Sequence, residues 1–162
     1  MANVISSLIG VNLTRVDASS AQQFPLGTQA MGTDGSLFEY VTCLSVISQY
    51  NAVVINEVGQ ASNATTTNVA AISKKIAVAQ VSIPLSSYGW VQRQGTMIVN
   101  VLADCQDVVL LFTTGTPGKL DDVTVSEGFV LGLVTVSSTS TASAVTALGA
   151  APLQISALTN PV

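Results

Sequence analysis

The sequence predicts a mainly β protein, a compact antiparallel β-barrel or β-sandwich with at most one or two short helices. Charged residues make up only 9% of the 162 residues, whereas hydrophobic residues make up 48%. Val, Ala, Ser and Thr are abundant, and the β-branched residues among them favour strands over solvated helices. Short segments of alternating hydrophobicity recur between turn signals, a spacing typical of sandwiches and barrels. The length fits one domain that buries a core without metal or disulfide staples.

The first segment, residues 1–16, is expected to be an N-terminal arm or a first strand. Part of it alternates as a half-buried strand does, and it fits equally an extended arm that docks on a neighbouring subunit. We therefore predict an interface with a neighbouring protein subunit in this arm, made by Ile5, Leu8, Ile9, Val11 and Leu13. After the arm, Asp17 and Ser19 favour one short turn of helix that ends before Pro25.

A turn followed by a two-sided strand is the clearest local signal. The turn is Thr33-Asp34-Gly35, in which Gly supplies the positive φ of a tight turn. Residues 37–46 are mostly apolar on both faces, which indicates a strand buried on two sides or in a subunit contact. We further expect a strand over residues 52–58, a polar Asn/Thr loop over residues 62–68, and an alternating strand over residues 76–81.

The segment from residue 88 onward predicts the remaining strands. Tyr88, Trp90 and Gln92 fall on one strand face and Arg93 on the other, where it is available to stack or to pair with an acidic residue, before Gly95 bends the chain. Strands are expected over residues 107–113 and 127–136. The Ser/Thr/Ala-rich end fits a strand partner, a loop or a flexible tail. The predicted organisation is an arm over residues 1–16, a β-rich domain over 17–153 and a C-terminal tail over 154–162.

The charge pattern argues against several kinds of partner. The net charge is −4, and the few basic residues form no face for phosphate contacts. No apolar run approaches the about 18 to 20 residues of a membrane-spanning helix, and residues 1–16 lack the features of a signal peptide. We expect no nucleic-acid partner, no membrane partner, and a protein that is made and used, or assembled, in a cytosol. A surface with so few ions is expected to contact other protein.

No catalytic or metal-binding motif emerges, so we expect neither an enzyme nor a cofactor. The chain contains no His, and single Ser residues are uninformative in a Ser/Thr-rich background. The sequence GTPGKL, from Gly115 to Leu120, lacks the spacing of a phosphate loop and is expected to be a turn. Cys43 and Cys105 fit two buried, reduced thiols better than a disulfide. An acidic region is expected to be a solvated loop edge rather than a metal site: Asp104, Asp107, Asp121, Asp122 and Glu127.

The sequence SSYGWVQRQG contains the only Trp of the chain beside a Tyr. Alternating aromatic residues on a strand are typical of a plug at one end of a β structure. We therefore interpret Tyr88 and Trp90 as a structural aromatic cluster. An aromatic platform for sugar binding is the alternative, and it requires Trp90 to be exposed to solvent.

Four segments, in order, resemble head-decoration or cement proteins of tailed bacteriophages. They cover most of residues 24–153 and read FPLGTQAMGTDGSLFEYVTC, IAVAQVSIPLSSYGWVQRQG, LLFTTGTPGKLDD and FVLGLVTVSSTSTASAVTALGAAPL. The most specific piece is YGWVQ, Tyr88 to Gln92. The resemblance implies a small β-rich knob, commonly trimeric, on the outer capsid face at local three-fold positions, without catalytic residues.

The expected function is therefore that of a structural virion protein. It decorates and cements the outer capsid surface by bridging neighbouring major capsid subunits, and its partners are the major capsid protein and its own copies in a homotrimer. A protein that binds only the assembled lattice stabilises that lattice by linkage. The alternative is a carbohydrate-binding or host-adhesion module displayed on a particle, with Tyr88 and Trp90 as its platform.

Overall fold

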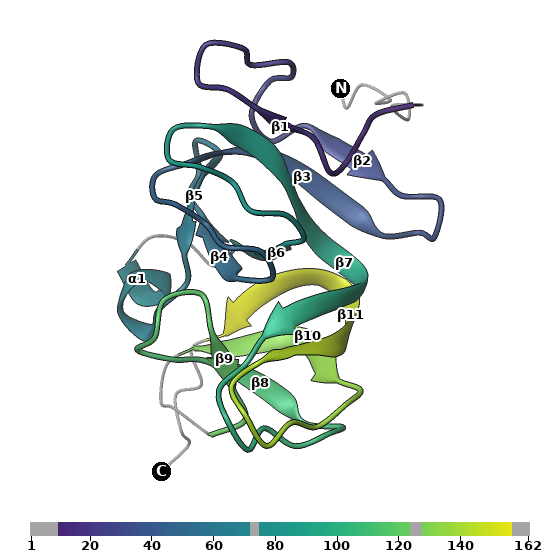
Figure 1. The fold of residues 1–162 in the computed structure, drawn as a ribbon, viewed down its shortest axis with the longest axis vertical. Coiled ribbons are helices and arrows are strands. Elements are labelled where there is room, and N and C mark those ends of the chain that lie inside the picture. The colour runs from purple at the N-terminus through teal and green to yellow at the C-terminus, as the bar shows by residue number, and fades with distance from the viewer. Residues whose placement is uncertain (1–9, 72–74, 124–127, 157–162) are drawn as a thin grey trace.

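The protein is mainly β, as a computed structural model describes it over residues 10–71, 75–123 and 128–156. The described part is a compact, sandwich-like structure with one short helix, so the predicted fold class is confirmed in its sandwich form (Figure 1). The elements are β1 (Val16–Asp17), β2 (Gln29–Met31), β3 (Leu37–Cys43), β4 (Ala52–Ile55), β5 (Gln60–Asn63), α1 (Thr66–Ala71), β6 (Lys75–Ala79), β7 (Tyr88–Asn100), β8 (Leu110–Thr113), β9 (Leu120–Asp121), β10 (Phe129–Thr135) and β11 (Ala144–Ser156).

The strands form one sheet with the order β1-β7-β3-β5-β4-β6-β11-β10-β8-β9, and β2 pairs with β3. The β3–β5 pair is parallel. Strand β6 pairs with both β4 and β7, and this completes a ring of paired strands in the upper half of Figure 1. The order around the ring is β7, β3, β5, β4 and β6. Strands β8 to β11 and the end of β7 make the lower sheet.

Strand β7 joins the two halves because it changes partners along its length. Residues up to Gln94 pair with β3, and residues from Gly95 onward pair with β11. Strand β7 continues through Gly95, the residue at which the sequence predicts that the chain bends. Gly95 has a φ of 99° and lies opposite Gly149.

Strands β4 and β6 separate two hydrophobic cores. One face of this pair contributes Val53 and Ala77 to a core inside the ring of strands. The opposite face contributes Val54 and Ile76 to a second core, which the lower sheet completes with residues such as Leu133. Two-sided burial explains why β4 is apolar at every position, since the residues of both strand faces are removed from water.

A third, aromatic core lies on the outer face of the β3–β7 pair. Tyr40 and Trp90 are buried there with Ala30. The N-terminal segment covers them with half-buried apolar residues, among them Phe24. The N-terminal segment is therefore part of the packed structure from Val11 onward.

The helix lies where the sequence predicts a polar loop. Thr65 and Asn68 cap α1 reciprocally: the Thr65 N–H donates to Asn68 Oδ1 (2.7 Å) and the Asn68 N–H donates to Thr65 Oγ1 (3.2 Å). The helical turn predicted after Asp17 is wrong, because Asp17 belongs to β1 and is buried. Strand β4 also ends at Ile55, earlier than predicted, in a turn that Asn56 and Gly59 form.

Candidate functional site

A surface groove of about 690 Å³ lies between the N-terminal segment and the turn that joins β2 to β3. Its walls combine apolar side chains with a few hydroxyl, amide and carboxylate groups. The lining residues that matter below are Val11, Leu13, Met31, Asp34, Phe38 and Gln92.

The predicted docking arm contributes one wall of this groove. Val11 and Leu13 are half-buried, pack against the aromatic core and line the groove. A local turn holds them there, since the Thr14 N–H donates to Asn12 Oδ1 (3.0 Å) and the Arg15 N–H donates to the Asn12 carbonyl (3.2 Å). The other predicted interface residues, Ile5, Leu8 and Ile9, lie outside the described residues.

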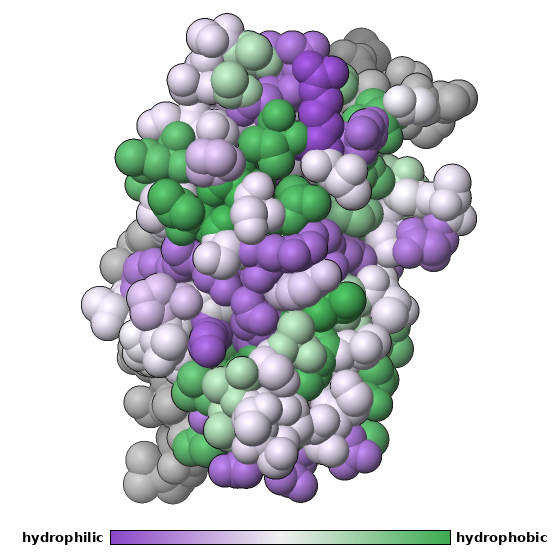
Figure 2. All heavy atoms as spheres, viewed as in Figure 1, coloured by the Kyte–Doolittle hydropathy of each residue, from purple (hydrophilic) through white to green (hydrophobic). Residues whose placement is uncertain are grey.

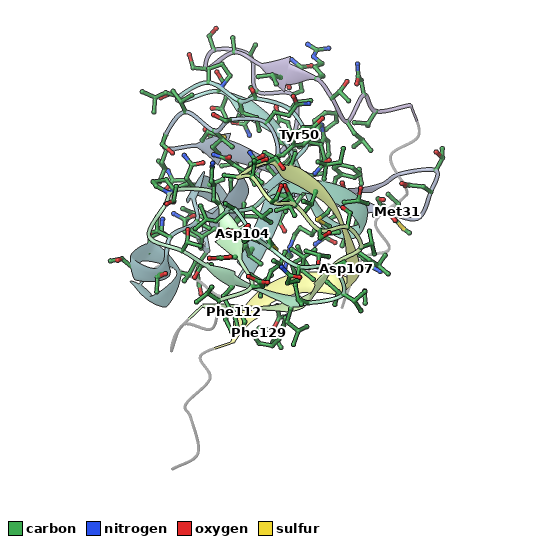
Figure 3. The ribbon with its side chains drawn as sticks, turned by 60° about the horizontal axis from the view of Figure 1, so that its bottom comes forward. Met31, Tyr50, Asp104, Asp107, Phe112 and Phe129 are labelled. Atoms are coloured by element: carbon green, nitrogen blue, oxygen red, sulfur yellow. The ribbon has the colours of Figure 1, made fainter. Side chains whose placement is uncertain are left out.

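The opposite wall is β2, which pairs only with β3 among the described strands. Its other edge is therefore unpaired within the part of the chain that the structure describes. Met31, at the end of β2, has 67% of its surface exposed and lies at the margin of the molecule in Figure 3. An exposed strand edge beside an apolar groove is a common docking site for extended protein segments.

Asp34 is the charged residue among those that line the groove. Its carboxylate accepts hydrogen bonds from the Ser36 N–H (3.0 Å) and the Ser36 hydroxyl (2.8 Å). The backbone and side-chain hydrogen bonds from Ser36 lower the pKa of Asp34. The carboxylate therefore stays ionised at neutral pH and gives this end of the groove a negative charge.

The aromatic cluster lies behind the groove and is closed to solvent at Trp90. Trp90 is 1% exposed, and its ring centroid lies 5.1 Å from that of Tyr40 and 5.3 Å from that of Phe24. Tyr88 is half-buried and stacks on Tyr40 at 6.0 Å. The exposed Trp90 that a sugar-binding platform requires is therefore not present.

Beneath these rings, Tyr40 forms a buried polar contact that the sequence does not reveal. Its hydroxyl donates to Asp17 Oδ2 (2.6 Å), and Arg15 Nε donates to Asp17 Oδ1 (2.6 Å). Burial, and next the hydrogen bond to Asp17, raise the pKa of Tyr40 to about 12. This contact ties β1, at the end of the predicted docking arm, to β3.

Arg93 pairs with an acidic residue, as the sequence suggests, and the partner is Glu39. Arg93 Nη1 lies 2.9 Å from Glu39 Oε2, and both side chains are buried. Arg93 Nη2 also donates to the Leu153 carbonyl (3.1 Å), while Lys75 Nζ lies 3.6 Å from Glu39 Oε1. The ion pair therefore links β3, β7, β6 and β11. It holds the ring and the lower sheet together.

The acidic residues of the lower half do not converge. Asp104 and Asp107 stand apart in Figure 3, and Asp122 accepts a hydrogen bond from the Gln106 N–H (3.0 Å). Over the described ranges, no three His, Cys, Asp or Glu side chains lie close enough together to hold a metal ion. Glu127 lies outside those ranges.

The remaining sequence predictions concern a turn, two thiols and membrane spans. GTPGKL forms a turn in which Gly118 has a φ of 76° and packs closely on Asn51. Cys43 and Cys105 are free and buried, and burial raises the pKa of these thiols to about 12 and about 11. None of the helical residues that the structure describes forms a helix long and apolar enough to cross a membrane.

Comparison with known proteins gives a likeness of fold. No protein-family model and no curated protein matches the chain. Among solved structures, the chain is similar to the N base of head fiber gp8.5 of bacteriophage phi29, with a TM-score of 0.50 and 15% sequence identity. The match covers 75% of this chain and 94% of that chain. The described β structure is thus shared by a protein of a phage head.

Proposed function

We propose that this chain is a non-catalytic structural protein of a phage virion, bound to the outer surface of the capsid. The observation that supports the proposal is the likeness of its fold to the base of a phage head fiber, over most of both chains. The sparse charge of the chain agrees with a protein whose surface is largely buried against other protein.

The proposed docking site is the groove between the N-terminal segment and β2. It offers the capsid a strand edge that is unpaired among the described residues, exposed Met31, and the apolar side chains of Val11 and Leu13. The partner is the major capsid protein. Binding across neighbouring capsid subunits, by a homotrimer of this chain, cements the shell because the bound state exists only on the assembled lattice.

Co-sedimentation with emptied tailed-phage capsids tests this function. The matched variants are Met31→Asp in the groove and Val58→Asp in the β4–β5 turn, whose side chains are 67% and 65% exposed. We expect saturable binding of the unchanged protein at a fixed ratio per capsomer, and particles that resist heat better. Met31→Asp should weaken binding at least about tenfold, since a charge enters an apolar contact, whereas Val58→Asp should bind normally.

The two parts of the proposal fail differently. If the folded protein binds no capsid of the phages tested, the structural role on those capsids is wrong. If it binds, and both variants bind as well as the unchanged protein, the capsid role stands and the groove is not the docking site.

A further inference from the structure

The outer face of the lower sheet carries two rows of uncharged side chains, which we call the outer apolar face. In the first row, backbone pairing places Thr96 beside Leu148, Leu148 beside Val134, and Val134 beside Leu110. The second row is Ile98, Thr146 and Val136: Ile98 pairs with Thr146, and the Val136 N–H donates to the Thr146 carbonyl (2.9 Å). Paired residues on one sheet face have Cβ atoms about 4.5 to 5.5 Å apart, so each row is continuous.

Four of the five large apolar residues in the two rows are exposed to solvent, and the fifth, Val134, is half-buried. Leu110 is 48% exposed, Leu148 47%, Val136 53% and Ile98 37%. A single exposed Leu needs no explanation, whereas contiguous apolar residues across four strands mark an interaction surface. The solvent face of an antiparallel sheet ordinarily carries polar residues.

The outer apolar face is also free of charge. Strands β8, β10, β11 and the part of β7 from Gln94 to Asn100 contain no Asp, Glu, Lys or Arg. The acidic residues of this half, such as Asp104 and Asp121, lie in the loop before β8 and in β9. Figure 2 shows one side of the molecule, on which hydrophobic residues gather above and below a hydrophilic band.

We propose that the outer apolar face packs against a second copy of this chain. Each copy has a net charge of −4, so a contact between charged surfaces of two copies sets like charges against one another, which opposes binding. A contact through this face involves no charged side chain of its strands. The outer apolar face is therefore the surface through which two copies can meet without setting like charges against one another.

The geometry agrees with such a contact. Four neighbouring strands about 4.8 Å apart make a face roughly 15 to 20 Å across, which suits the apolar centre of a protein interface surrounded by a polar rim. A sheet face packs against a neighbouring protein layer at a separation of about 10 Å, with interdigitated side chains, so each copy of a cyclic oligomer can contact the next through it. The inference rests on the proposed function only for the self-association of the chain, to which it assigns a surface, and it does not depend on capsid binding.

Sedimentation equilibrium of the full-length protein over a wide concentration range tests the proposal. The variants are Leu148→Lys and Ile98→Lys, one in each row, and the control is Val58→Lys, which is exposed in the β4–β5 turn. We expect the unchanged protein and Val58→Lys to form the same oligomer. Each face variant should weaken association about a hundredfold or more, because an unpaired charge is then buried in the contact.

The folded state of each variant is checked by far-UV circular dichroism and by its urea unfolding midpoint. Leu148 and Ile98 are exposed, so their substitution should leave the fold intact, and two variants in separate rows guard against misfolding of either one. A monomeric unchanged protein at every concentration overturns the proposal. So does an oligomer that persists in both folded face variants.

Discussion

The ionisation of the buried Tyr40 hydroxyl makes the stability of the protein depend on pH. Its side chain is fully buried, and its hydroxyl donates to the Asp17 carboxylate (2.6 Å). Ionised tyrosinate loses this donor and places a second negative charge beside Asp17. For these reasons the pKa of Tyr40 rises to about 12 from an ordinary value of about 10.

The raised pKa predicts a loss of stability in alkali. Below about pH 10 the phenol is protonated in both the folded and the unfolded chain, and its contribution to stability is fully present. Between about pH 10 and 12 the unfolded chain releases this proton first, so the free energy of unfolding falls by about 2 kcal/mol in that window.

Urea unfolding of the unchanged protein and of Tyr40→Phe, compared from pH 8 to pH 12, measures this effect. The variant lacks the titrating hydroxyl and should lose less stability above about pH 10. At neutral pH it should be less stable by about 1.5 to 3 kcal/mol, the usual contribution of a hydrogen bond to a charged group. Equal losses in both proteins above pH 10 contradict the assignment.

At the scale of elements, Gly95 allows β7 to serve two sheets. Its φ of 99° is a conformation that residues with a Cβ rarely adopt, and a Cβ at this position meets the Ser36 side chain, with Ser36 Cβ at 2.9 Å. The strand therefore passes from its pairing with β3 to its pairing with β11 at a residue that only Gly fits.

Gly95→Ala should destabilise the protein by about 1 to 3 kcal/mol, because it adds backbone strain and a steric clash. Gly115→Ala is the matched control, since a Cβ at Gly115 meets nothing within 4 Å. Thermal unfolding followed by circular dichroism compares the two. A Gly95→Ala variant as stable as the control would show that β7 relaxes freely at this point.

The elements also show which structural features the sequence could predict. The alternation around Trp90 and the two-sided apolar pattern of β3 are local, and both strands begin where the pattern places them. Strand β3 ends at Cys43, however, and leaves Leu44 and Val46 of the predicted strand exposed. The sequence does not decide between a strand, a loop and a tail for β11, because its Ala, Ser and Thr residues become a strand only through pairing with β10 and β7. Asp is a common helix-capping residue, which is why the sequence predicts a helical turn at Asp17. In the structure, however, its carboxylate accepts a hydrogen bond from Tyr40, which is distant in sequence.

The candidate site was predictable to a similar extent. Val11 and Leu13 were recognisable as an apolar arm, and the structure places both at the groove. The groove itself depends on how the β2–β3 turn packs beside that arm, a contact between segments that no local pattern encodes. Likewise, the sequence suggests an acidic partner for Arg93, but only the register of β3 against β7 identifies that partner as Glu39.

At the scale of the whole molecule, the two main cores share strands, so we expect them to unfold together. Strand β4 places Val53 in the core of the ring and Val54 in the core under the lower sheet. The buried pair of Glu39 and Arg93 adds a second connection. If one core unfolds, β4 and β6 lose the packing on one of their two faces, and the other core then loses the strands on which it is built. This dependence of each core on the same two strands makes unfolding cooperative.

The single Trp makes this cooperativity measurable. Trp90 lies in the aromatic core of the upper half, whereas Leu133 is fully buried under the lower sheet. Leu133→Ala should cost about 2 to 5 kcal/mol, and Ser138→Ala, at an exposed position of the same half, should change stability by less than about 0.5 kcal/mol. In urea, the Trp90 fluorescence midpoint should fall with the circular dichroism midpoint by the same amount. A Trp90 transition that stays in place while circular dichroism develops two steps would mean that the ring and the lower sheet unfold as separate units.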